Sequence, residues 1–122
     1  MRILVVDDEP LVAQTLTLVF RHNGFDAAMA YNADQALALL RDAPPDLVLC
    51  DIDMPGRDGV ALMSDLTREL PECPILVLTG FYSGLGRVRE FTSTLRQQVS
   101  IVVKPCQPVD LLRYAGELLK TA

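Results

Sequence analysis

The sequence of 122 residues lacks the features of several large classes of protein. No apolar run in it approaches the roughly 20 residues that a membrane-spanning helix needs. It also lacks a signal peptide, because the short apolar run at its start leads directly into Asp7-Asp8-Glu9. These absences argue against association with a membrane and favour a cytoplasmic protein.

Cysteine and basic residues are also scarce. The three cysteines are an odd number without the spacing of a metal site, which favours a reducing compartment and no disulfide framework. With 11 basic and 16 acidic side chains the net charge is −5, which argues against direct binding to nucleic acid. The acidic excess lies in residues 1–80, where the net charge is −8, whereas residues 81–122 have a net charge of +3.

Half of the residues are hydrophobic, which is enough for the core of a single domain over residues 1–122. Apolar runs predict five buried strands, at residues 2–6, 25–31, 47–50, 75–78 and 99–103. Apolar residues at helical spacing predict five helices, at residues 10–22, 33–41, 59–70, 87–98 and 111–119. Because strands and helices alternate over short connections, we expect an α/β fold with a parallel sheet and helices on both faces.

Two of the predicted helices have further signals at their ends. Pro10 is a natural first helical residue, Gly24 suits a left-handed cap, and Leu11 begins the apolar residues at helical spacing between them. Asn32 and Gln35 form a capping-box-like start for the second helix.

The segment from Leu47 to Gly56 contains Asp51, the central residue of the candidate site. Four apolar residues run into Asp51, and a turn sequence that begins at Met54-Pro55 closes the run, as is typical of a strand buried on both faces. An aspartate at the carboxyl end of such a strand lies where α/β sheets bind their ligands. On its own, Asp51 would more often be a turn residue that caps the next helix, because aspartate is common in turns.

Polar side chains also follow three other predicted strands. They are, in chain order, Asp7 and Asp8 after the first strand, Thr79 after the fourth and Lys104 after the fifth. Because the carboxyl ends of parallel strands meet at one edge of the sheet, we expect these side chains to converge with Asp51. Converging carboxylates favour a hard divalent cation, and oxygen ligands with room for water suit Mg²⁺ better than zinc. A carboxylate beside Mg²⁺ and a lysine would be well placed to attack a phosphoryl group.

These residues resemble the receiver domain of response regulators in two-component signalling, and the resemblance covers the whole chain. It rests on four pieces in order, namely Asp7-Asp8, Asp51 with Met54-Pro55 and Asp58-Gly59 after it, Thr79, and Lys104-Pro105. It implies a flavodoxin-like fold, a five-stranded parallel sheet of order 2-1-3-4-5 with helices on both faces. It also implies a signalling domain rather than an enzyme, one that catalyses its own phosphorylation and slow dephosphorylation.

The resemblance assigns roles to the acidic residues. Asp51 would accept a phosphoryl group from a phosphohistidine on a histidine kinase or a histidine phosphotransfer protein. Asp8 and Asp51 would bind Mg²⁺ directly, together with the backbone carbonyl of Asp53. Asp7 would act on the metal through a water molecule.

The resemblance also implies a switch. Lys104 would pair with the phosphoryl group, and its peptide bond to Pro105 is expected to be cis. Thr79 would move toward the phosphoryl group and pass the change to the face formed by the fourth helix, the fifth strand and the fifth helix. A downstream protein would bind that face, and a phosphorylation-dependent homodimer could form through it.

Three features depart from the family pattern. Ile101 stands three residues before Lys104, where members usually have Tyr or Phe, so the usual coupling to an aromatic side chain cannot operate there. The segment 80–98 is longer than usual and rich in Gly and Arg. This composition predicts a solvent-facing helix, a mobile segment that changes order on phosphorylation, or a surface for an acidic partner. Asp53 and Phe81 flank the path of an attacking water, and we expect them to influence the lifetime of the phosphoryl group.

Simpler structural interpretations exist for single residues. Asp7 and Asp8 could cap the first helix, and Thr79 could be an ordinary strand terminus. Lys104 is harder to explain in this way, because a lysine that ends a buried strand needs a negative partner. We interpret Asp58 as a turn and cap residue.

Two other functions stay open on the sequence. The Asp51-Ile52-Asp53 pair resembles the Asp-x-Asp pair of haloacid-dehalogenase-type aspartyl-phosphate phosphatases, although those enzymes carry it on the first strand rather than the third. A pseudo-receiver would keep the fold as an interaction module without phosphotransfer. Four intact site residues argue against that second alternative, namely Asp8, Asp51, Thr79 and Lys104. Ile101 and the unusual fourth helix are consistent with it.

Overall fold

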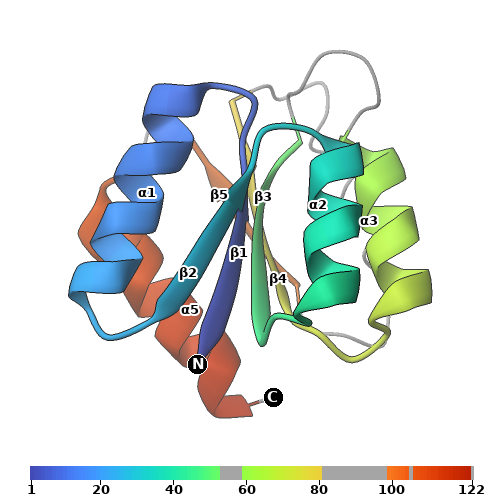
Figure 1. The fold of residues 1–122 in the computed structure, drawn as a ribbon. Coiled ribbons are helices and arrows are strands. Elements are labelled where there is room, and N and C mark those ends of the chain that lie inside the picture. Colours follow the sequence, from blue (N-terminus) through green and yellow to red (C-terminus); the bar gives the residue numbers. More distant parts are fainter. Residues whose placement is uncertain (53–58, 81–98, 105, 122) are drawn as a thin grey trace.

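The structure, a computed structural model, describes residues 1–52, 59–80, 99–104 and 106–121. Within these residues five strands form one sheet in the order β2-β1-β3-β4-β5, and each pairing is parallel. The strands are β1 (Arg2–Val6), β2 (Asp26–Ala30), β3 (Leu47–Asp51), β4 (Ile75–Thr79) and β5 (Val99–Val103). This arrangement confirms the predicted order 2-1-3-4-5 and the parallel sheet (Figure 1).

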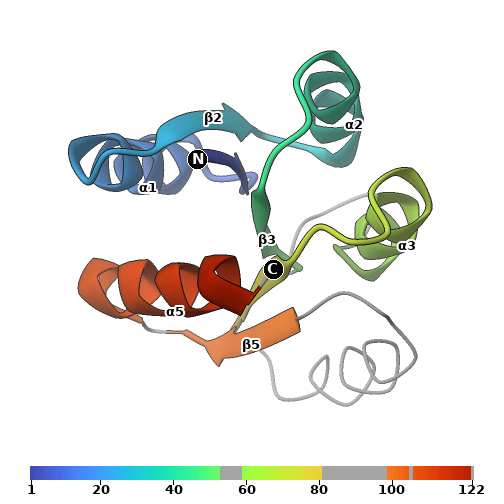
Figure 2. The ribbon, with the colours of Figure 1, turned by 90° about the horizontal axis from the view of Figure 1, so that it is seen from below.

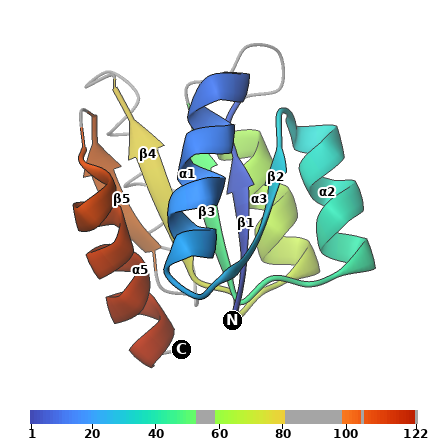
Figure 3. The same cartoon turned by 60° about the vertical axis from the view of Figure 1, so that its left-hand side comes forward.

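The described helices cover both faces of the sheet. They are α1 (Pro10–His22), α2 (Ala33–Asp42), α3 (Gly59–Glu69) and α5 (Pro108–Thr121). One face carries α1 and α5 side by side, and the other carries α2 and α3 (Figures 2 and 3). The helix predicted at 87–98 lies outside the described residues. Among the residues that the structure describes, no helix has the length and apolar character needed to cross a membrane.

Each face of the sheet has its own hydrophobic core, because alternate residues of a strand point to opposite sides. Val48 and Cys50 of β3 pack with side chains of α2 and α3, whereas Leu47 and Leu49 pack with side chains of α1 and α5. Every residue of β3 and β4 is buried, as the apolar runs predict. Truncating one large side chain in such a core costs about 2–5 kcal/mol, so β3 is a firm support for the aspartate at its end.

Local sequence signals explain where the helices begin. Pro10 occupies the first position of α1, and Gly24 after that helix has φ +90°, a backbone angle that glycine tolerates best. At α2, Asn32 Oδ1 accepts a hydrogen bond from the backbone N–H of Gln35 at 2.8 Å, which confirms the predicted cap. Helix α5 begins at Pro108, earlier than the predicted start at 111, because proline with its fixed φ suits the first turn.

The apolar pattern of α1 extends beyond its buried face at Leu11. Leu11 has 76% of its surface exposed, although it continues the apolar pattern of α1. The buried residues of this helix include Ala13, Leu16 and Phe20, and at 100° per residue Leu11 points away from them. Helical spacing alone did not separate the buried face from the exposed one.

The edge at the carboxyl ends of the strands is fixed by backbone hydrogen bonds. The N–H of Asp7 donates to Ala30 at 3.0 Å, and the N–H of Ile52 donates to Leu78 at 3.1 Å. The N–H of Lys104 donates to the carbonyl of Thr79 at 2.8 Å. The residues that leave β1, β3 and β5 are therefore each tied to a neighbouring strand. The N- and C-termini lie at the opposite, amino edge (Figure 1).

Candidate functional site

Three carboxylates meet at the carboxyl edge of the sheet. Asp7 and Asp8 follow β1, and Asp51 is the last residue of β3. One oxygen from each of the three lies within 4.8 Å of the others. Asp7 and Asp51 are buried, with 2% and 4% of their surface exposed, whereas Asp8 is half-buried. The structure thus brings together side chains that are more than 40 residues apart in the sequence.

Lys104 joins this cluster from β5, on the far side of β4. Its ammonium Nζ donates to Oδ2 of Asp51 at 2.8 Å, a short charge-assisted hydrogen bond. The Asp51 side chain is 5% exposed and that of Lys104 is 36% exposed, so the carboxylate is the more deeply buried partner. A buried carboxylate of this kind needs a cation or several donors, and Lys104 supplies the cation.

The cluster contains three carboxylates and one ammonium, and the pKa of Asp7 is shifted in this environment. The pKa of Asp7 is raised from its ordinary 3.8 to about 6, mainly because the carboxyl is buried. The nearby carboxylates of Asp51 and Asp8 contribute to this rise, while the backbone N–H of Glu9, 3.0 Å from Oδ1, and the ammonium of Lys104 oppose it. Because neighbouring carboxylates are part of the cause, a positive charge placed among the three would be stabilised.

Thr79 lies at the same edge, at the end of β4. It is fully buried, and its carbonyl accepts the hydrogen bond from Lys104. In the strand register Asp51 pairs with Leu78, so Thr79 on the neighbouring strand is one residue beyond the position opposite Asp51. The backbone bond links Thr79 directly to the residue that holds the Asp51 carboxylate.

Some predicted features fall outside the described residues, namely the carbonyl of Asp53, the side chain of Phe81, the peptide bond of Pro105 and the cap at Asp58. Ile101 is described. It is half-buried on β5 and packs against the core beneath α2 and α3. An aliphatic side chain therefore occupies the position at which the receiver domains that this sequence resembles usually have an aromatic residue.

The donor set at this edge fits a hard divalent cation. Carboxylate oxygens are the ligands that Mg²⁺ prefers, and it usually takes only one or two of them and keeps several waters. Within the described residues, the oxygens of Asp7, Asp8 and Asp51 are near enough to serve one ion directly or through water. No cysteine or histidine belongs to this cluster, which distinguishes it from a structural zinc site.

The sheet order, the acidic cluster and the lysine at the carboxyl edge are the features that the resemblance to receiver domains predicts. The comparison with known proteins identifies the same family. The chain belongs to the response regulator receiver domain family, whose model matches residues 3–115. The family and the fold that the sequence predicts are thereby confirmed.

Individual relatives support the same assignment. The chain is 44% identical over 111 residues to the DNA-binding response regulator MtrA of Mycobacterium tuberculosis, with 91% of this chain and 47% of that protein covered. It is 34% identical over 124 residues to the transcriptional regulatory protein AruR of Pseudomonas aeruginosa, with 98% and 49% covered. The chain therefore spans about half the length of the curated relatives it matches.

Solved structures share its fold over nearly the whole length. The receiver domain of NtrX from Brucella abortus has a TM-score of 0.85 at 28% identity, with 98% of this chain and 99% of that chain covered. A CheY-like receiver domain protein from Methanospirillum hungatei has a TM-score of 0.88 at 27% identity, with 98% and 94% covered.

The sequence missed one feature close to this site. Leu11 and Leu18 are 76% and 55% exposed, and with Thr15 and His22 they form one solvent-facing line along α1. This helix starts directly after the carboxylate pair, so the line runs away from the edge that carries Asp51. These four residues follow the spacing i, i+4, i+7 and i+11, which places them on one face of a helix. The sequence could have revealed this line only if the opposite face of the helix had been assigned to the core.

Proposed function

We propose that this chain is a phosphoacceptor domain, in which Asp51 takes a phosphoryl group from a phosphohistidine of a histidine kinase or a histidine phosphotransfer protein. The observation that carries the proposal is the buried Asp51 carboxylate, held at 2.8 Å by Lys104 within a cluster of acidic groups. An ordinary turn aspartate has neither burial nor such neighbours.

The proposed reaction is an in-line displacement. An oxygen of Asp51 forms a bond to phosphorus as the bond from phosphorus to the histidine nitrogen breaks, and the imidazole leaves with the electron pair. Lys104 already points at the attacking carboxylate, so its ammonium can transfer its hydrogen bond to a phosphoryl oxygen as charge develops there. The Thr79 hydroxyl would bind another phosphoryl oxygen.

Asp8 and Asp51 would hold Mg²⁺ with the backbone carbonyl of Asp53, and Asp7 would act through a bound water. When bound, the metal would offset negative charge on the phosphoryl oxygens. The geometry of the cluster supports this assignment, because one oxygen from each of Asp7, Asp8 and Asp51 lies within 4.8 Å of the others.

The partner that delivers the phosphoryl group must approach the carboxyl edge. The exposed line of Leu11 and Leu18 on α1 is next to that edge and offers apolar surface to a helical partner. We therefore propose that the kinase or phosphotransfer protein binds α1. The downstream protein would bind the face formed by the fourth helix predicted at 87–98, β5 and α5, where phosphorylation could also favour a homodimer.

We further propose that the domain works in the cytoplasm as a signalling module that phosphorylates itself and loses the phosphoryl group slowly. MtrA and AruR are a DNA-binding response regulator and a transcriptional regulatory protein of about twice this length, so any contact with DNA would lie outside this chain. The net charge of −5 supports that view.

Intact mass spectrometry tests the proposal. After incubation with Mg²⁺ and acetyl phosphate, the wild type should gain one phosphoryl group and Asp51→Asn should gain none. Asp42→Asn, at an exposed position at the end of α2, is the control and should behave like the wild type. A pseudo-receiver would bind Mg²⁺ and stay unmodified even with phosphohistidine donors, whereas steady turnover of a phosphate monoester would support the phosphatase alternative.

A further inference from the structure

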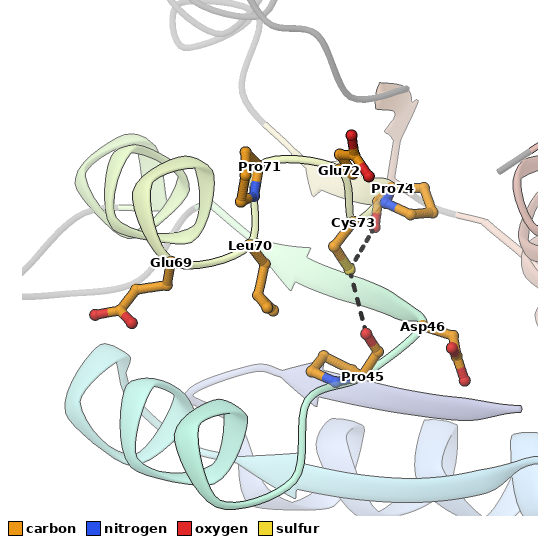
Figure 4. A pocket seen from close by; sticks show the side chains of 8 residues that line it. All are labelled: Pro45, Asp46, Glu69, Leu70, Pro71, Glu72, Cys73 and Pro74. Atoms are coloured by element: carbon orange, nitrogen blue, oxygen red, sulfur yellow. Dashed lines mark hydrogen bonds between the residues drawn. The ribbon is translucent and has the colours of Figure 1, made fainter.

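A groove lies at the amino edge of the sheet, opposite the acidic cluster. It is formed by the connection between α2 and β3 and the connection between α3 and β4, and its volume is about 380 Å³ (Figure 4). Leu70 and Cys73 point toward Pro45 across it, whereas the carboxylates of Asp46, Glu69 and Glu72 lie around its margin. The groove thus has an apolar floor and an acidic rim.

The walls of this groove are held in place by hydrogen bonds. The N–H of Cys73 donates to Leu70 at 3.2 Å, and the N–H of Val48 in β3 donates to Pro74 at 3.1 Å. The Cys73 sulfur lies 3.6 Å from the carbonyl oxygens of Pro45 and Pro74, and its single S–H can donate to one of them at a time (Figure 4). The contact with Pro45 links the two connections. A site whose walls are already fixed binds a ligand with little loss of conformational entropy.

The charge around the groove has one sign. Among its lining residues, all of which the structure describes, there is no lysine or arginine. Burial raises the pKa of Cys73 to about 11, so its thiol is neutral at physiological pH. Arg41, outside the groove, hydrogen-bonds Glu69 at 2.6 Å, and Asp46 accepts a hydrogen bond from the backbone N–H of Arg2. Glu72 is the third carboxylate of the groove, and it is exposed.

A second, apolar pocket lies directly beyond Pro45. Its volume is about 210 Å³, and its apolar walls come from β1, β2 and the end of α2, namely Ile3, Leu4, Ala28, Leu39 and Ala43. Pro45 lines both hollows and so forms the ridge between them. The rim cation of this pocket, Arg2, is paired with Asp26 at 3.3 Å.

We propose that the amino edge is a docking site for a segment of a partner protein that carries a basic side chain next to an apolar one. The basic residue would lie in the acidic groove beside Glu72, and the apolar residue would fill the pocket on the other side of Pro45. Charge complementarity selects this occupant, because the groove offers carboxylates and no cation among its lining residues. The site is on the far edge from Asp51, so its binding does not depend on the phosphoacceptor function.

The test uses two blocked dipeptides with the full chain, acetyl-leucyl-arginine amide and its neutral isostere acetyl-leucyl-citrulline amide. In ¹⁵N-edited NMR titrations, the arginine probe should shift the amides of Asp46, Leu70, Glu72 and Cys73 with saturation. It should bind about threefold or more tightly than the citrulline probe, the ratio expected for one partly exposed charge pair. Glu72→Gln should remove this preference, whereas Glu117→Gln on the exposed surface of α5 should keep it.

Three results would overturn the proposal. Equal affinities for the two probes would show that the site binds the apolar side chain and does not select for positive charge. Shifts spread over all acidic surfaces, unaffected by Glu72→Gln, would show non-specific attraction. Shifts of the groove amides that grow with protein concentration in the absence of a probe would show that a second copy of the chain occupies the edge instead.

Discussion

The two edges of one sheet collect acidic side chains in opposite ways. At the carboxyl edge, Asp7, Asp8 and Asp51 bring their oxygens within 4.8 Å of one another, and two of the three residues are buried. At the amino edge, Asp46 accepts a hydrogen bond from the backbone N–H of Arg2 at 2.7 Å, and Glu69 is paired with Arg41. The first edge concentrates negative charge, whereas the second distributes it among separate partners.

The pKa values follow this difference. Burial and neighbouring carboxylates raise the pKa of Asp7 to about 6, whereas the hydrogen bond from Arg41 lowers the pKa of Glu69. When folding raises the pKa of a carboxyl group, the ionised carboxylate destabilises the folded state. When folding lowers the pKa, the ionised carboxylate stabilises the folded state. At the carboxyl edge a cation would stabilise the clustered carboxylates, whereas at the amino edge Glu69 already has such a cation in Arg41.

The largest expected effect concerns the cation at the carboxyl edge. Lys104→Met should slow phosphorylation by acetyl phosphate at least about 100-fold, because it removes the fixed positive charge from the phosphoryl oxygens. Lys120→Met, in the last turn of α5, is the matched control and should leave the rate unchanged. Initial rates from intact mass measure both. A loss below about threefold for Lys104→Met would remove Lys104 from the proposed reaction.

The next effect is a gain in stability when a carboxylate is removed. Without Mg²⁺, Asp7→Asn should raise the free energy of unfolding by about 1–3 kcal/mol at pH 7.5, since two pKa units correspond to roughly 2.7 kcal/mol. Asparagine keeps the oxygen that accepts the Glu9 N–H, so the local hydrogen bond survives. Urea unfolding measures the difference.

The sign of its pH dependence is fixed by the direction of the shift. The pKa of Asp7 is higher in the folded state than its ordinary 3.8, so the wild type is penalised fully above about pH 6 and progressively less as the pH falls toward 4. The advantage of Asp7→Asn should therefore shrink over that window. An advantage that stays constant from pH 7.5 to pH 4 would mean that charge repulsion is not its source.

Metal binding should act on the same edge. Mg²⁺ at ten times its dissociation constant should raise the free energy of unfolding of the wild type by about 1.4 kcal/mol, because it binds only the folded state. Asp8→Asn should lose most of this gain, and the exposed Asp42→Asn should retain it. Unfolding curves at matched ionic strength decide, and an equal gain for Asp8→Asn would exclude it as a ligand.

The sequence was enough to predict which residues meet at the carboxyl edge, because the topology of the sheet determines their positions. Once Asp51 ends a buried parallel strand, the residues that end β1, β4 and β5 must lie near it, whatever the details of packing. The amino-edge groove has no such rule. It depends on how Pro45 in one connection meets Cys73 in another, and on which carboxylates happen to be paired. Leu11 shows the same limit, because helical spacing does not reveal which face meets the sheet.

The smallest expected effect separates the two edges most directly. A double-mutant cycle on Arg41→Gln and Glu69→Gln should give a weaker coupling in stability than a cycle on Lys104→Met and Asp51→Asn, because the side chains of Arg41 and Glu69 are 60% and 27% exposed. Salt should weaken the first coupling more than the second, since water and ions reach only the exposed pair freely.

The first coupling should also vanish when the pH falls below the lowered pKa of Glu69, because the protonated carboxyl no longer attracts the guanidinium. Cycles at pH 7 and pH 3, each at low and high NaCl, measure both dependences. If the Arg41–Glu69 coupling were the stronger and resisted salt, burial would not be what distinguishes the two edges.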